Sequence, residues 1–179
     1  MIIGDRKKFA FDLKKISDKD HLSQLKIFVD GKNICEWEDK ETGQIRTIQW
    51  NLDELITFLH DTEAFLYHDD PFPINTVGEC ASELENNARD FESANEDEMD
   101  DYYDRLNDWV YNHSWNHARA GAIVPDVLFR NVNGDMEVSW WNDDEEVEFT
   151  NRYGYTIVPA EIYRNLIEQL FSNYNTMWL

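Results

Sequence analysis

The hydrophobic period of the sequence changes at about residue 51, from the period of strands to that of helices. Before this change, residues 24–50 (QLKIFVDGKNICEWEDKETGQIRTIQW) alternate apolar and polar side chains in three runs, as strands with one buried face do. Asp30-Gly31 has the composition of a type I′ turn, and Gly43 suits the left-handed position of a longer loop. This stretch therefore predicts a three-stranded antiparallel meander over 24–50.

From residue 51 onward the apolar side chains recur every three or four residues, which is the period of an amphipathic helix. We expect a first helix over 51–68, capped by Asn51 and Glu54 and ended by the proline-containing segment DDPFPI. A second helical region is expected over 79–120, with Ser93 or Asn95 capping its main helix. The buried stripe of that helix is predicted to comprise Met99, Tyr102 or Tyr103, Leu106, Trp109 or Val110, and His113.

The last third of the chain returns to strands and closes with a helix. Gly121 is expected as a helix C-cap, and a hairpin is expected over 123–141 around Asn133-Gly134. A final helix over 159–173 would turn Ile162, Leu166, Ile167 and Leu170 inward. The order of elements predicts one α+β domain over 1–179, in which an N-terminal antiparallel meander, an acidic helical middle, a β-hairpin and a C-terminal helix pack together.

Charge is the most extreme property of the composition. The chain has 16 basic and 37 acidic side chains, for a net charge of −21. Residues 51–110 carry two basic and eighteen acidic side chains, so the acid is concentrated in the helical middle. This field disfavours direct binding of nucleic acid or of anionic membranes, and it attracts a basic protein partner.

The acids of the second helical region gather on the face opposite its buried stripe. We therefore predict a partner-binding face made of Glu96, Asp97, Asp100, Asp101, Asp104 and Asp108. Trp140 and Trp141 are neighbours on one expected strand and cannot both face the core, so Trp141 is added as a candidate contact. The leading hypothesis is a non-enzymatic acidic binding protein, an immunity-type or regulatory inhibitor of a basic toxin or nuclease.

Two other functional hypotheses remain open from the residues. His113 and His117 have the spacing of two ligands on one helix, which would suit a metal-dependent hydrolase. The residue after the first histidine is Ser114, however, where zinc peptidases carry the glutamate that serves as general base. A DNA mimic that copies phosphate spacing with carboxylates is the other alternative. No cofactor is expected, because the seven glycines form no phosphate-binding loop.

The two cysteines and the absence of a long apolar run bear on location. Cys35 and Cys80 do not form a Cys-x-x-Cys pair, and we expect both to be reduced and buried. No apolar segment approaches the roughly 20 residues needed to cross a bilayer, and the first residues do not have the pattern of a signal peptide. We therefore expect a cytoplasmic protein, whose oligomeric state the sequence leaves open.

The stretch 113–140 (HSWNHARAGAIVPDVLFRNVNGDMEVSW) resembles a segment of uncharacterised bacterial proteins, some of them linked to ImmA/IrrE-type metallopeptidases. That segment has the form H-S-x3-A-x2-G-[GA]-x2-P-[DN]-[VIL]-x-[FI]-R, followed after a turn by E-[VIL]-S-W. The matching positions are His113, Ser114, Ala118, Gly121, Ala122, Pro125, Asp126, Val127, Phe129, Arg130, Gly134, Asp135, Glu137, Val138, Ser139 and Trp140. The chain has no H-E-x-x-H, so the resemblance implies a prokaryotic cytoplasmic setting among defence or toxin-control genes and no peptidase activity.

Overall fold

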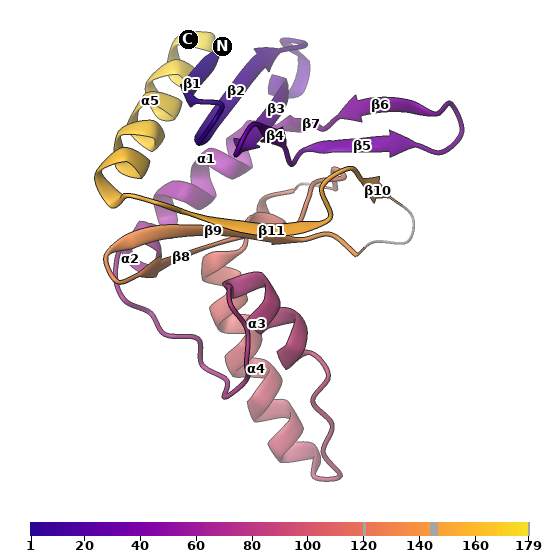
Figure 1. The fold of residues 1–179 in the computed structure, drawn as a ribbon, viewed down its shortest axis with the longest axis vertical. Coiled ribbons are helices and arrows are strands. Elements are labelled where there is room, and N and C mark those ends of the chain that lie inside the picture. The colour runs from indigo at the N-terminus through magenta and orange to yellow at the C-terminus, as the bar shows by residue number, and fades with distance from the viewer. Residues whose placement is uncertain (120, 144–146, 179) are drawn as a thin grey trace.

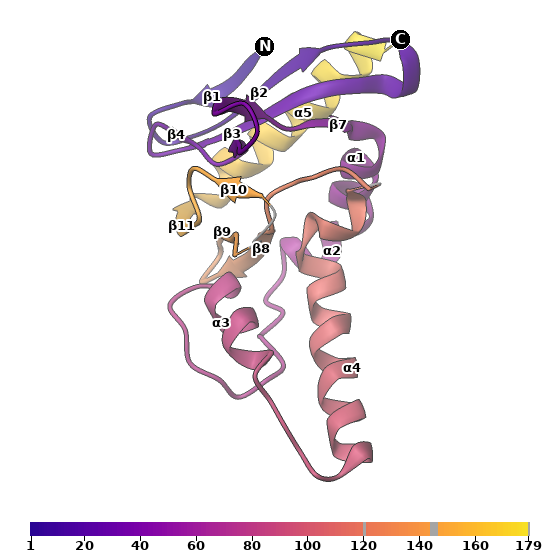
Figure 2. The same ribbon diagram turned by 90° about the vertical axis from the view of Figure 1, so that its right-hand side faces the viewer.

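The computed structural model describes residues 1–119, 121–143 and 147–178, with the side chain of Asp20 excepted. Helices and antiparallel sheets segregate along the chain and pack as one α+β domain, as the order of sequence patterns predicts (Figure 1). Sheet A lies at the end of the molecule that carries both termini, sheet C crosses the middle, and two helices project from the far side of sheet C (Figures 1 and 2).

Sheet A consists of strands near the N-terminus and one returning strand. Its order is β1-β2-β3-β4, and β7 also pairs with β3. A short 3-10 helix, η1 (Lys19–His21), joins β2 to β3. Alternate residues of β3 are buried, which is the reason for the period of two in its sequence. The strand bounds are β1 (Ile2–Asp5), β2 (Phe9–Lys15), β3 (Leu22–Val29), β4 (Lys32–Asn33) and β7 (Gln49–Asn51).

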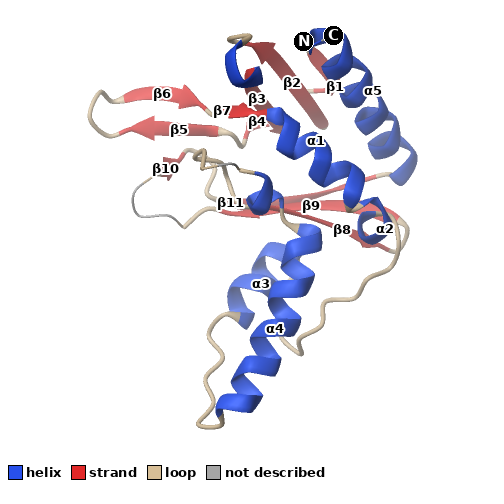
Figure 3. Cartoon of the chain, turned by 180° about the vertical axis from the view of Figure 1, so that it is seen from behind, coloured by secondary structure: helices blue, strands red, loops and turns tan. Residues whose placement is uncertain are grey.

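The expected meander has its first turn at Asp30-Gly31, where both residues have positive φ, 49° and 81°. Its strands do not stay in one sheet, however. The Asn33 side chain accepts a hydrogen bond from the backbone N–H of Cys35 and turns the chain out of sheet A. The next hairpin extends beyond the body of the molecule (Figure 3). This hairpin consists of β5 (Glu36–Asp39) and β6 (Gln44–Thr47). Together with the later strand β10 (Glu148–Phe149) it makes up sheet B.

The helix expected over 51–68 is divided into α1 (Leu52–Asp61) and α2 (Glu63–Leu66). Asn51 caps α1, because its side chain accepts a hydrogen bond from Asp53 N at 2.9 Å. The closing helix α5 (Ala160–Trp178) is longer than expected and packs against β1, β2 and β9. The prediction that Ile162 points inward was wrong. Ile162 is 46% exposed, and its neighbour Tyr163 is fully buried instead.

Sheet C has the order β11-β9-β8, formed by β8 (Val127–Val132), β9 (Asp135–Trp141) and β11 (Tyr153–Val158). Asn133 and Gly134 make the predicted hairpin turn with positive φ. The Met136, Val138 and Trp140 side chains of β9 join the main hydrophobic core. The other face of β9 is also covered, because α3 (Ala81–Ala88) packs on it.

The region expected to be helical over 79–120 contains α3, α4 (Glu96–His113) and a 3-10 turn, η2 (Trp115–Ala118). The chain leaves α4 at Ser114, which is extended, so Gly121 is not the C-cap of this helix. The N-terminal end of α4 and the connection that leads to it from α3 lie farthest from the chain termini (Figure 2). Among the described residues, no helix is long and apolar enough to span a membrane.

Candidate functional site

The acidic face of α4 is exposed along its whole length. We define this face as Glu96, Asp97, Asp100, Asp101, Asp104 and Asp108, all of which are exposed. The opposite side of the helix buries Leu106, Trp109 and His113. The amphipathic pattern thus brings together the six acids that the sequence predicts, on an element that projects from the body (Figure 1).

Few cations neutralise this face. Arg105 forms an ion pair with Asp101, at 3.2 Å between Nε and Oδ2. Within the part of the chain that the structure describes, the other five carboxylates of the acidic face form no ion pair. Like charges four residues apart on a helix, such as Asp97 with Asp101 and Asp104 with Asp108, destabilise it by about 0.2–0.5 kcal/mol per pair. The helix therefore carries a repulsion that a basic partner would relieve.

The helix dipole explains the position of only some of the acidic residues of α4. Glu96, Asp97 and Glu98 occupy the first turn, where negative charge is stabilised by the free N–H groups. Asp104 and Asp108 lie beyond that turn and gain little from it. They continue the row of Asp97 and Asp101, and the row reaches Tyr111, which is 60% exposed. One side of α4 thus presents carboxylates followed by an exposed aromatic ring.

Aromatic contacts join the N-terminal half of α4 to α3. The Tyr103 hydroxyl donates to the backbone oxygens of Arg89 and Phe91, at 2.8 and 3.0 Å. The neighbouring Tyr102 ring stacks on Phe91 at 3.9 Å, and its hydroxyl donates to Ala88 O. These contacts tie α4 to the end of α3 and to the connection between the two helices. Helices α3 and α4 and the connection between them form a two-helix arm, which has its own small hydrophobic core. The acidic face lies on this arm.

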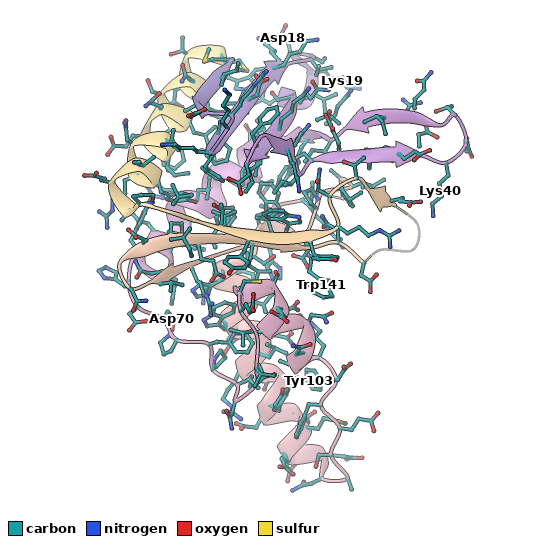
Figure 4. All side chains as sticks on the ribbon, viewed as in Figure 1. Asp18, Lys19, Lys40, Asp70, Tyr103 and Trp141 are labelled. Carbon is teal, nitrogen blue, oxygen red and sulfur yellow. The ribbon has the colours of Figure 1, made fainter. Side chains whose placement is uncertain are left out.

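Trp141 lies apart from the acidic face. It belongs to β9 in sheet C, whereas the acids lie along the projecting helix (Figure 4). Trp140 is buried and Trp141 is only partly so, in agreement with the expectation that the two rings face different sides. The Trp141 ring contacts Tyr153 of β11, with centroids 5.6 Å apart. Trp141 therefore lies on a different element from the six acidic residues, and the predicted binding residues are not all on one helix.

The two histidines do not share a helix. His113 is the last residue of α4, whereas His117 lies in η2, after the chain has turned at Ser114. His113 is fully buried, stacks on Trp109 at 3.9 Å and places Nδ1 2.8 Å from Trp109 O. His117 is exposed and lies beside the Tyr111 ring. No group of three or more His, Cys, Asp or Glu side chains within the described ranges is arranged to hold a metal ion.

Burial changes the titration of two groups at the base of the arm. Desolvation lowers the pKa of His113 below its usual 6.5, although Asp70 Oδ2 lies 3.7 Å from Nε2 and opposes this shift. Desolvation raises the pKa of Asp126 from 3.8 to about 6, and the nearby Glu85 adds to the effect. Asp126 lines a pocket of about 440 Å³ that also contacts Arg119, Trp141 and Asn142. Its carboxylate accepts a hydrogen bond from the Ser114 hydroxyl at 3.2 Å.

The polar residues of the stretch 113–140 fasten the arm to sheet C. Ser114 and Asp126 join the end of α4 to the start of β8. On the neighbouring strand, Glu137 accepts a hydrogen bond from Ala81 N, and the Ser139 hydroxyl oxygen accepts one from Ser82 N. The first turn of α3 thus rests on two β9 side chains. Sequence reasoning missed this pair, although a glutamate in the middle of an apolar strand is a signal of a buried polar contact.

Both cysteines are free and buried, as expected, and burial raises the pKa of Cys35 to about 12. A thiol in this state is a poor nucleophile. Comparison with protein-family models, with curated proteins and with solved structures gave no match for this chain.

Proposed function

We propose that this protein is a non-enzymatic acidic inhibitor, of the immunity or regulatory type, that binds a basic protein partner through the acidic face of α4. The observation that carries the proposal is the row of exposed, mostly unpaired carboxylates on a projecting helix. Such a face raises the association rate with a positively charged surface and selects against acidic competitors. A toxin or a nuclease, whose own site is basic because it binds phosphates, is the class of partner that fits.

The arm also supplies what an acidic row lacks by itself. Exposed ion pairs contribute only about 0.2–1 kcal/mol each, so charge alone gives speed and selectivity more than affinity. Tyr111 continues the row at the base of the arm and is 60% exposed. Tyrosine is enriched among the residues that dominate binding energy, because its ring buries a large area at low entropic cost. We therefore assign Tyr111 to the same interface as the acids.

The test compares two variants that change the net charge equally. One variant combines Asp97→Asn, Asp101→Asn, Asp104→Asn and Asp108→Asn on the arm. The control combines Glu38→Gln, Glu41→Gln, Glu161→Gln and Glu168→Gln, which are exposed acids outside the arm. Each protein is immobilised, and basic proteins are captured from the native host at low and high salt.

We expect the wild-type protein and the control to retain the same basic partner at low salt and to release it at high salt. The arm variant should bind that partner about 4-fold to several hundred-fold more weakly, at about 0.2–1 kcal/mol for each of the four lost ion pairs. The purified partner should also lose its own activity in a one-to-one mixture with the wild-type protein. Recovery of no basic partner at low salt, or equal recovery by the arm variant, would contradict the proposal.

A further inference from the structure

Strand β11 is an edge strand of sheet C. It pairs with β9 on one side and ends the order of sheet C on the other. The opposite edge of the sheet, β8, is packed against α2, α4 and η2. A bare edge is a liability that proteins usually reduce with charged residues, proline or a short strand. The sequence of β11, YGYTIV, contains no charged residue and no proline.

The pairing register shows which backbone groups of β11 are free. Asn142 N donates to Arg152 O, and hydrogen-bonded pairs alternate along an antiparallel ladder. The hydrogen-bonded pairs that follow are Gly154 with Trp140, Thr156 with Val138, and Val158 with Met136. The N–H and C=O groups of Tyr153, Tyr155 and Ile157 consequently point away from β9. In the described chain these backbone groups have no hydrogen-bond partner.

The side chains of the same three residues are exposed. Tyr153, Tyr155 and Ile157 are 70%, 44% and 43% exposed, and all three lie on the face of sheet C on which α3 packs, because they stand opposite Trp141, Ser139 and Glu137. Helix α3 packs mainly on β9 and β8. The strand thus combines unpaired backbone groups with a row of exposed apolar side chains, and what satisfies both is another extended strand.

We propose that β11 pairs antiparallel with β11 of a second copy of this chain, about a two-fold axis at Tyr155. In this register Tyr155 faces Tyr155 of the partner subunit, and Tyr153 faces Ile157 of the partner subunit. Every outward N–H and C=O group of the three residues then meets its complement. Aromatic pairs and pairs of an aromatic with a β-branched residue are the cross-strand combinations that stabilise sheets most. The result is a continuous sheet made of two copies of sheet C.

Charge opposes a second copy least at this place. Two chains of net charge −21 repel each other over most of their surface, so they approach most easily where acid is absent. Residues Tyr153–Val158 are such a strip. A closed two-fold dimer is also the commonest symmetric assembly, because one self-complementary patch is sufficient to form it.

The experiment measures the molar mass of the whole chain by sedimentation and light scattering, up to concentrations on the order of 100 µM, where a micromolar interface is occupied. We expect the wild-type protein to shift toward twice 21.3 kDa. Added salt should strengthen the dimer, because it screens the repulsion between the two acidic chains. This response is opposite to that expected for binding of a basic partner, so the two proposals fail independently.

Two substitutions and a control separate pairing from general stickiness. Tyr155→Lys places two like charges opposite each other and should abolish the dimer. Tyr155→Pro removes an outward N–H that makes no bond within the chain, so it should weaken the dimer and leave the monomer fold intact. Ile45→Lys, on the exposed hairpin of sheet B, adds the same charge at a residue that is 56% exposed and should have no effect.

A covalent probe tests the register. In a hydrogen-bonded antiparallel pair the Cα atoms are about 5.5 Å apart, which a disulfide can bridge. Tyr155→Cys should therefore form a disulfide-linked dimer under mild oxidation, whereas Ile45→Cys should not. The native Cys35 and Cys80 are buried and do not compete. A wild-type protein that is monomeric over the whole concentration range, or a Tyr155→Lys variant as dimeric as the wild type, would overturn the proposal.

Discussion

The carboxylate of Glu137 accepts a hydrogen bond from the backbone N–H of Ala81, with Oε1 2.6 Å from the nitrogen. This contact joins residues 56 apart in the sequence and sets the start of α3 on the middle of β9. The second carboxylate oxygen accepts from Arg130 Nη2 at 2.8 Å. Glu137 is 1% exposed, so these two hydrogen bonds offset the cost of burying its polar oxygens.

Replacement of Glu137 should destabilise the protein strongly. Glu137→Ala leaves Arg130 without its counter-ion and the first turn of α3 without an acceptor, which should cost about 3–5 kcal/mol in the free energy of unfolding. Glu137→Gln keeps an acceptor oxygen and should cost less. Denaturation in urea, followed by circular dichroism, measures both changes. A loss below about 1 kcal/mol for Glu137→Ala would mean that this contact does not hold the arm.

Asp126→Asn should stabilise the protein at neutral pH. Burial raises the pKa of Asp126 to about 6 in the folded state, above its value of 3.8 in the unfolded chain. The folded state therefore binds this proton more tightly, and the wild type gains stability as the pH falls through about 6 toward 4. The asparagine oxygen still accepts the Ser114 hydroxyl. At pH 8 the gain has an upper bound of about 3 kcal/mol, at 1.4 kcal/mol per pH unit.

The pH dependence of that gain is the critical measurement. The advantage of Asp126→Asn over the wild type should shrink as the pH is lowered from 8 to 4, because the wild-type carboxyl becomes neutral in the folded state. Asp108→Asn, which removes an exposed carboxylate, serves as the matched control. A difference between Asp126→Asn and the wild type that is the same at pH 8 and pH 4 would refute the assignment.

His113 should act in the opposite direction. Burial lowers its pKa in the folded state below the 6.5 of an unfolded chain, so this residue contributes stability that is lost as the pH falls through 6.5. His113→Phe keeps an aromatic ring beside Trp109 and cannot be protonated. The loss of stability caused by His113 is best measured in the Asp126→Asn background. There the Asp126 carboxyl, whose effect on stability has the opposite pH dependence, is absent.

We expect the Asp126→Asn protein to lose more stability between pH 8 and pH 5 than the Asp126→Asn/His113→Phe protein does. Thermal or urea unfolding across this range gives the comparison. An NMR titration of the His113 ring in the folded protein provides an independent reading of its pKa. Equal losses in the two proteins would show that Asp70, 3.7 Å away, compensates for the burial of the ring.

Gly154→Ala should destabilise sheet C through a clash with Trp140. A Cβ atom at residue 154 would lie 2.7 Å from the Trp140 ring, closer than van der Waals contact allows. Forcing an extra methyl group into a packed site costs about 1–3 kcal/mol. Trp140→Phe shortens the ring and should make the two changes less than additive in a double-mutant cycle. Additive losses would place the cost of the alanine elsewhere than at Trp140.

Local sequence signals determined much of the fold. The amphipathic period predicted the exposed acids and the buried Leu106, Trp109 and His113 of α4, and Asn133-Gly134 predicted the hairpin turn. These features depend on contacts between residues close in sequence, which a period of two or of 3.6 records directly. The α+β class follows from their order, because each element needs a partner for its apolar face.

Other features depend on contacts between residues distant in sequence, which no local pattern records. The strands expected as one meander are divided between sheets A and B, and the final helix buries Tyr163 where Ile162 was expected. No local sequence pattern indicates three further features. These are the hydrogen bond between Glu137 and the start of α3, the burial of Asp126, and the position of β11 at the edge of its sheet. The acidic face of α4 follows from the spacing of its residues alone. Long-range packing places this face on a projecting arm and leaves β11 at the edge of sheet C, because burial and pairing depend on which distant surfaces meet.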